Sequence, residues 1–241
     1  GTLPPAAVIS QGDIRVYRYR PPSRTGVHPN LGGINAIALG ADTTQRVTAQ
    51  WQLLQRDLDY YVDPSGLWFA LTARLDLNDY LAVSYVSAAG AVGTFPAQDT
   101  PIVPGQAPRD TLRLIVQPRV DATRPTFRHE MRHIYRVAGA DLDLSSVRVG
   151  LSLNRSERPL RPGAQPTYLA ELGLATPADP TVFNLQDRLF PRLRDPTAAG
   201  TIRESYIVLP HLEPFADPTR LLATERNDSL YRTPDYLLYS E

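Results

Sequence analysis

Five consecutive residues, His129-Glu130-Met131-Arg132-His133, match the pattern H-E-x-x-H. In zinc peptidases this pattern lies on a helix, where it places two histidine ligands one turn apart and a glutamate between them as the general base. His129 and His133 are therefore candidate metal ligands, and Glu130 is the candidate catalytic residue. If the pattern is functional, the chain is a metallopeptidase.

A catalytic zinc also requires a third protein ligand. The remaining histidines, His28 and His211, do not have the spacing of the extended metzincin motif, and Arg136 stands where that motif has glycine. A glutamate ligand from a following helix would have to be Glu157 or Glu171, and Glu157 falls in a turn rich in arginine and proline. Glu171 is thus the candidate third ligand, although nothing else in the sequence singles it out.

The motif must be positioned by its helix, which we predict over residues 125–138. The two histidines then lie opposite the apolar face, next to Arg132 and Arg136, whose positive charges would repel a divalent cation. A pattern with three fixed positions also arises by chance in unrelated chains. These arguments favour a coincidental match and a non-enzymatic protein without a cofactor. The apolar face of the predicted helix consists of Phe127, Met131, Ile134 and Ala138.

Composition restricts the remaining chemistry of this 241-residue chain. All 25 basic residues are arginine, which excludes Schiff-base lysines and the lysine of phosphate-binding loops. Cysteine is absent, so the chain has no disulfide, no thiolate metal site and no cysteine nucleophile. The formal net charge is zero, and no stretch approaches the roughly 20 apolar residues of a membrane-spanning helix. We therefore expect neither nucleic acid as a partner nor direct insertion into a membrane.

Two further groups of residues could bind a ligand. Asp179, Asn184 and Asp187 lie close together in sequence and could hold calcium, although such residues more often cap helices and satisfy turns. Aromatic residues at strand spacing could form a platform on which a carbohydrate stacks, although a place in the hydrophobic core is the more common role. This aromatic group consists of Tyr60, Tyr61, Trp68 and Phe69.

The elements around these residues indicate an α+β fold that is mainly β. In the first half of the chain, short apolar runs alternate with turn signals such as Asp63-Pro64-Ser65-Gly66, which is typical of a sandwich or an open barrel. The stretch from Asp99 to Pro108 contains three prolines and a glycine and is the best linker candidate. We therefore expect a β-sandwich-like domain over residues 1–108 and a smaller, loop-rich mixed α+β domain over residues 109–241. The strands expected up to the start of the second domain cover residues 14–19, 47–53, 67–71, 80–86 and 111–117.

The second domain has weaker signals. Residues 147–153 alternate apolar and polar side chains and predict a strand, and residues 202–209 predict another. Residues 167–174 suggest a short helix that ends at Gly173, and most of the other helical potential lies in residues 218–225. Across the two domains we expect the cores to include Trp51, Trp68, Phe127 and Met131.

A series of apolar segments occurs in a characteristic order. Tyr60-Tyr61-Val62-Asp63-Pro64-Ser65-Gly66-Leu67-Trp68 is followed by Leu81-Ala82-Val83-Ser84-Tyr85 and then by five more segments. In this order and spacing the chain resembles the soluble region of the SprA/Sov-type outer-membrane translocon of type IX secretion, over about Gln50 to Tyr231. Neither histidine of the H-E-x-x-H pattern belongs to the family pattern. The later segments are residues 90–95, 112–115, 133–139, 168–174 and 207–215.

The resemblance implies a parent protein that is a giant single-chain β-barrel, which lets folded proteins cross the outer membrane and is linked in some bacteria to gliding motility. This chain would be a soluble structural module of it, associated with the outer membrane or cell envelope, because its strands lack the long lipid-facing bands of membrane strands. Its partners would be the rest of the parent barrel and accessory outer-membrane proteins, and the fragment itself is expected to be monomeric. A zinc metallopeptidase and a glycan-binding β-sandwich remain the alternatives.

Overall fold

The protein is mainly β in the computed structural model and divides into two compact units. The first unit contains the chain up to Glu130, and the second spans Met131–Thr233. In the described part of the chain, no helix is both long and apolar enough to cross a membrane. The structure describes residues 13–22, 33–41, 45–97, 107–119, 122–137, 143–153, 156–158, 165–193 and 202–233.

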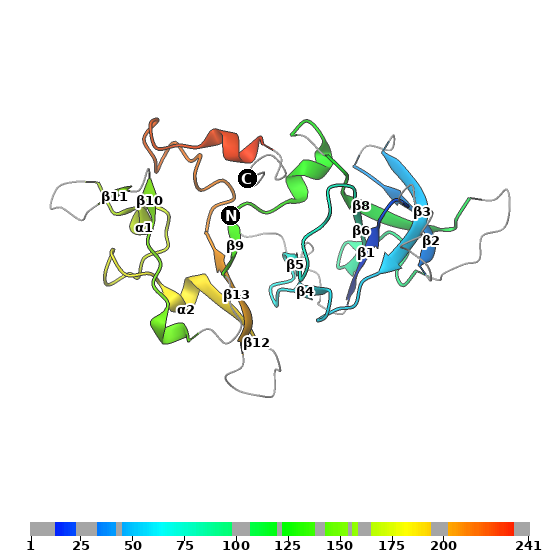
Figure 1. Cartoon of the computed structure of the whole chain (residues 1–241), viewed down its shortest axis with the longest axis horizontal. Helices are drawn as coiled ribbons and strands as arrows, with labels where there is room; N and C mark the ends of the chain where they lie inside the picture. The colour runs from blue at the N-terminus through cyan, green and yellow to red at the C-terminus, as the bar shows by residue number, and fades with distance from the viewer. Residues whose placement is uncertain are drawn as a thin grey trace. The chain divides into compact units, whose positions relative to one another are not determined.

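The first unit is built on a five-stranded, mixed, barrel-like sheet with the strand order β1-β3-β2-β8-β6 (Figure 1). The sheet closes because β1 also pairs with β6 along its whole length. All neighbouring strands in it are antiparallel except β2 and β8, which are parallel. A further short strand, β7 (Gly90–Val92), pairs with β6. The five strands are β1 (Ile14–Tyr19), β2 (Ile34–Leu39), β3 (Arg46–Leu53), β6 (Tyr80–Ser87) and β8 (Asp110–Val116).

Alternation along the strands sends every second side chain into the interior of this sheet. Trp51 is fully buried there, and its indole Nε1 donates a hydrogen bond to the carbonyl of Ala36 at 3.2 Å. The predicted core position of Trp51 is therefore confirmed. The buried interior residues are Tyr17, Ile34, Ala36, Ala38, Trp51, Ala82, Leu112 and Leu114.

A hairpin of β4 (Tyr60–Val62) and β5 (Phe69–Leu71) covers the outer face of β1 and β6. Tyr60 is fully buried against this face, and its hydroxyl donates to the carbonyl of Ile14 at 3.2 Å. Both faces of β6 are thus buried, which explains the continuous apolar run Leu81-Ala82-Val83. The buried residues of this outer cluster are Ile14, Val16, Leu54, Tyr60, Val62, Leu81 and Val83.

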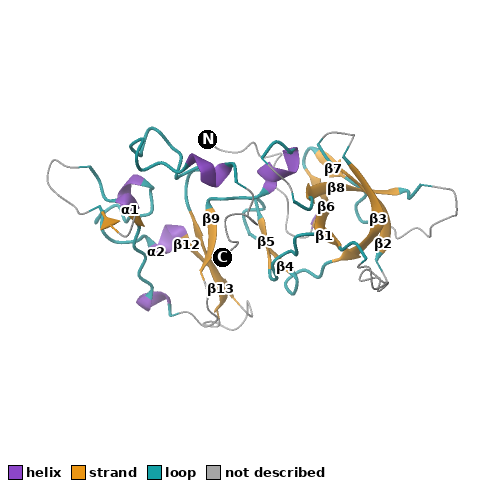
Figure 2. Ribbon diagram, turned by 45° about the horizontal axis from the view of Figure 1, so that its top comes forward, coloured by secondary structure: helices purple, strands orange, loops and turns teal. Residues whose placement is uncertain are grey.

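The second unit has a three-stranded antiparallel sheet with the order β12-β13-β9 and several short elements (Figure 2). Its strands are β9 (Ile134–Val137), β12 (Leu189–Leu193) and β13 (Ile202–Val208), with a separate pair of β10 (Ser152–Leu153) and β11 (Ser156–Glu157). Its helices are α1 (Tyr168–Glu171), α2 (Leu185–Arg188) and the 3-10 turns η4 (Leu144–Ser146) and η5 (Asp228–Tyr231). Its buried core consists of Leu169, Leu172, Leu174, Phe183, Leu189, Leu209 and Leu221.

The helix predicted over residues 125–138 is wrong. The structure has a 3-10 helix, η3 (Pro125–His129), and then the strand β9. The spacing of apolar residues suggested a helix. Residues 134–137 instead form backbone hydrogen bonds with β13, and this tertiary pairing overrides the local preference. Phe127 is buried as predicted, but Met131 is 40% exposed, so its predicted core position is wrong. The predicted position Ala138 lies outside the described residues.

The other predicted elements differ in how far they form. The strands predicted at residues 14–19, 47–53, 80–86, 111–117 and 202–209 are confirmed within one or two residues at each end, and that at residues 67–71 forms as the shorter β5. The predicted short helix is α1, and Gly173 follows it with a φ of 70°. The strand predicted over residues 147–153 is reduced to β10, and residues 218–225 form turns in place of a helix.

The strand expected to open the second domain completes the first sheet instead. β8 pairs with both β2 and β6, and the boundary between the two compact units falls between Glu130 and Met131. Of the predicted linker between Asp99 and Pro108, residues 99–106 lie outside the described residues.

Candidate functional site

The H-E-x-x-H residues lie on either side of the division between the two units. His129 ends η3, and its ring Nδ1 donates a hydrogen bond to the carbonyl of Ile115 at 3.0 Å. Glu130 is exposed and has an extended backbone with φ −75° and ψ 123°. His133 precedes β9, and its carbonyl accepts a hydrogen bond from the amide of Leu209 at 2.9 Å. The two histidines therefore do not share the helical face that the zinc motif requires.

The candidate metal ligands each have separate surroundings and separate interaction partners. Burial lowers the pKa of the His133 imidazole from its ordinary value. Glu171 lies on α1, and its carboxylate is 3.7 Å from a guanidinium nitrogen of Arg158. His211 lies in the turns that follow β13, and His28 is outside the described residues. Within the described ranges, no group of three or more histidine, aspartate or glutamate side chains could hold a metal ion.

Arg158 is the centre of a polar cluster in the second unit. Its Nη2 donates to both carboxylate oxygens of Glu225 at 2.5 Å, and its guanidinium lies 4.3 Å from the centre of the Tyr168 ring. Tyr168 also donates its hydroxyl to Glu225 at 3.0 Å. Burial opposes ionisation of Glu225, but hydrogen bonds from Arg158, the Leu222 amide and Tyr168 lower the pKa of its carboxyl overall. The cluster connects the end of β11, helix α1 and the turn at Glu225, which is a structural role.

The residues considered for calcium have their oxygens engaged in local hydrogen bonds. Asp179 accepts hydrogen bonds from the amide and hydroxyl of Thr181 at 2.8 and 2.6 Å, and these bonds lower the pKa of its carboxyl. Asn184 caps α2 by accepting from the amide of Asp187 at 3.1 Å, and its side-chain amide donates to the Asp187 carboxylate at 2.8 Å. These contacts are those of a turn and a helix cap.

The aromatic group of the β4–β5 hairpin does not present coplanar rings. Tyr60 and Phe69 meet edge to face at 79°, with their ring centres 6.3 Å apart. Tyr61 and Trp68 also meet edge to face, at 71° and 6.0 Å. Tyr60 is fully buried and Trp68 is half-buried. The ring geometry is that of edge-to-face packing, and Tyr60 and Phe69 pack in the outer cluster. Carbohydrate stacking needs an exposed ring face instead.

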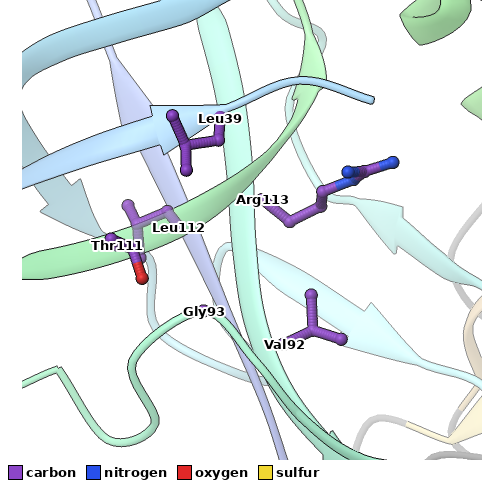
Figure 3. A pocket seen from close by; sticks show the side chains of 6 residues that line it. All are labelled: Leu39, Val92, Gly93, Thr111, Leu112 and Arg113. Carbon is purple, nitrogen blue, oxygen red and sulfur yellow. The ribbon is translucent and has the colours of Figure 1, made fainter. Parts of the chain in front are cut away.

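A small open cavity of about 160 Å³ lies on the sheet of the first unit, and we call it the wall cavity (Figure 3). It is formed where β2, β8 and the end of β7 meet. Figure 3 shows Thr111 and Leu112 at the left of the view, Arg113 and Val92 at the right, Leu39 above and Gly93 below. The guanidinium of Arg113 donates to the carbonyl of Gly40 at 3.1 Å. The lining residues are Leu39, Val92, Gly93, Thr111, Leu112 and Arg113.

Sequence reasoning missed both Arg158 and the wall cavity. Arg158 stands in an arginine-rich stretch of the sequence, and its partner Glu225 is far along the chain, so no local spacing links the two. The wall cavity depends on the parallel pairing of β2 with β8, and β2 was not predicted. The one available signal was the glycine-containing segment after β7, whose Gly93 has a φ of 73°.

Comparison with protein-family models, with curated proteins and with solved structures gives no match to this chain.

Proposed function

We propose that the chain is a non-enzymatic structural module of a larger cell-envelope protein resembling the SprA/Sov-type translocon of type IX secretion, where it serves protein secretion or the docking of partner proteins. The supporting observation is that several of the segments behind the resemblance contribute buried residues to the hydrophobic clusters of the two units. Leu81 and Val83 belong to the outer cluster of the first unit, and Leu112 belongs to its interior. Leu169 and Leu209 belong to the core of the second unit. That these segments form core positions supports a structural role for the chain in this proposal.

Two carboxylates with little exposed side-chain surface are each held by an arginine and also serve the scaffold. Asp79 has no exposed side-chain surface and accepts two hydrogen bonds from Arg20, at 3.0 and 3.3 Å. Glu225 is similarly held by Arg158 in the second unit. Such fixed pairs suit a rigid module that presents surfaces to neighbouring proteins. We also propose that the first unit is layered like a β-sandwich. The β4–β5 hairpin, which packs over β1 and β6, supports this.

In this proposal the partners are the rest of the parent protein and accessory outer-membrane proteins, and the location is the outer membrane or cell envelope. The decisive experiment is to determine the full coding sequence and to fractionate cells that carry an epitope tag in the parent protein. We expect a far longer polypeptide, rich in barrel strands, that fractionates with the outer membrane. A stand-alone secreted protein of this length would contradict the proposal.

A metal measurement separates this proposal from the zinc-peptidase alternative. We expect a metal-free preparation and a zinc-supplied preparation to melt at the same temperature, because a ligand that binds only the folded state would raise the melting temperature. Elemental analysis of the supplied protein after desalting should find no stoichiometric zinc. Bound zinc that is lost in His129→Gln and His133→Gln variants would favour the peptidase instead.

A further inference from the structure

The wall cavity combines an arginine with aliphatic walls. Leu39 and Arg113 are register partners across the parallel β2–β8 pair, so their side chains lie on the same face of the sheet. Val92 faces them from the end of β7 (Figure 3). Ligand sites commonly have this composition, with apolar walls and a few polar groups that fix orientation.

The guanidinium of Arg113 has N–H donors beyond the one that binds the Gly40 carbonyl. A guanidinium carries five N–H groups, and one nitrogen of Arg113 donates to the Gly40 carbonyl. Among the described residues, no carboxylate pairs with Arg113, in contrast to Arg20 and Arg158. The Gly40 bond restrains the side chain, and the planar fork of the remaining donors matches a carboxylate.

The floor of the cavity is fixed by the backbone of Gly93. A Cβ atom on this residue would lie 2.7 Å from the Thr111 carbonyl oxygen, and its φ of 73° also favours glycine. The next amide, that of Thr94, donates to the same carbonyl at 2.7 Å. The Thr94 hydroxyl in turn accepts from the Thr111 amide at 3.0 Å. These bonds hold the floor against β8, so it is formed before any ligand arrives.

We propose that the wall cavity binds a carboxylate that carries a short branched aliphatic chain. Arg113 receives the carboxylate, and the chain packs against Leu39 and Val92. The volume of about 160 Å³ is well below the roughly 300 to 1,000 Å³ of sites for drug-sized ligands, which limits the ligand to a small group. A free short-chain acid and the C-terminal residue of a peptide share this chemistry. The inference does not rest on the proposed function.

The test is a titration of the isotope-labelled full chain followed by amide NMR. The probes are 4-methylpentanoate, its neutral amide and N-acetyl-leucine, each used up to about 10 mM because ligands of this size bind weakly. We expect saturable shifts of the Val92, Gly93 and Thr111 amides with 4-methylpentanoate and at least about tenfold weaker binding of the neutral amide. Tighter binding of N-acetyl-leucine would identify a peptide C-terminus as the source, and tighter binding of the simple acid would identify a free metabolite.

Two variants and one control make the outcome specific. Arg113→Gln should weaken carboxylate binding at least about tenfold, and Val92→Phe should abolish it by filling the cavity while the charge remains. Arg148→Gln removes a comparable arginine, which donates to the backbone carbonyls of Ser145 and Val147 in the other unit, and should leave binding unchanged. Unchanged tryptophan fluorescence would show that the first unit folds in Arg113→Gln and Val92→Phe. Equal binding of acid and amide, binding unaffected by Arg113→Gln, or no saturable shift would overturn the proposal.

Discussion

At the scale of single residues, Asp79 is a buried carboxylate of the first unit that is paired with an arginine. It lies just before β6, its side chain is fully buried, and Arg20 just after β1 donates two hydrogen bonds to it. Asp79 also accepts a hydrogen bond from the amide of Asp76 at 3.2 Å. The pair joins the end of β1 to the start of β6, at the seam that closes the sheet.

We expect Asp79→Asn to lower the free energy of unfolding by about 1–3 kcal/mol, because a buried acceptor of charge-assisted hydrogen bonds becomes neutral. The figure lies below that for a fully buried ion pair because Arg20 is 40% exposed and therefore screened by solvent. Urea unfolding monitored by tryptophan fluorescence measures the loss. Asp76→Asn is the matched control, because the Asp76 side chain is 68% exposed, and it should cost less than about 1 kcal/mol. Equal losses would show that burial of Asp79 does not set the strength of the pair.

His133 gives the second unit a defined response to acid. Burial lowers its pKa in the folded state below the ordinary value of 6.5, so the unfolded chain binds a proton more readily than the folded chain. The free energy of unfolding should therefore fall as the pH drops below about 6.5, and the loss should level off below the folded pKa. Hydrogen exchange of the Leu209 amide, which donates to the His133 carbonyl, measures this stability locally. A His133→Gln variant should lose this part of the pH dependence, and an unchanged profile would contradict the prediction.

At the scale of elements, the strands that could be predicted from the sequence are those whose buried faces produce a regular pattern of apolar residues. β1, β3 and β6 alternate or run apolar because they line the closed sheet or lie between its interior and the hairpin. β9 could not be predicted in this way, because its conformation depends on pairing with β13, in which Tyr135 faces Ile207. The apolar residues before and within it happen to recur at helical spacing. The zinc interpretation requires a helix at this position. Pairing with β13 makes residues 134–137 a strand instead, and the local spacing of apolar residues does not reveal that pairing.

The β4–β5 hairpin offers a test of an element through two adjacent tyrosines. Tyr60 faces the outer cluster, is fully buried and donates to Ile14, whereas Tyr61 on the opposite face is half-buried. We expect Tyr60→Ala to cost about 3–5 kcal/mol of unfolding free energy, as for other large-to-small core substitutions. Tyr61→Ala should cost less, about 1 kcal/mol, since Tyr61 is only half-buried and its ring contact with Trp68 is edge to face. Thermal unfolding of both variants checks the difference. Similar losses would mean that the hairpin does not pack on the sheet as described.

At the scale of the whole molecule, the structure has separate cores. The interior of the closed sheet and the outer cluster belong to the first unit, and the leucine-rich cluster around Leu174 belongs to the second. Both tryptophans, Trp51 and Trp68, lie in the first unit. Tryptophan fluorescence therefore reports on one unit alone, and this asymmetry allows the cooperativity of the chain to be measured without cutting it.

We expect Leu174→Ala to destabilise the second unit by about 2–5 kcal/mol and to leave the urea midpoint of tryptophan fluorescence unchanged. Leu114→Ala, in the closed interior of the first sheet, should shift that midpoint by a comparable free energy and leave the exchange protection of the Leu209 amide unchanged. The double variant should then show both effects additively, within about 0.5 kcal/mol, because independent cores do not share the cost of a cavity. If Leu174→Ala moved the fluorescence midpoint, the two units would unfold together as one cooperative unit. The division after Glu130 would then describe residue contacts but not separate unfolding transitions.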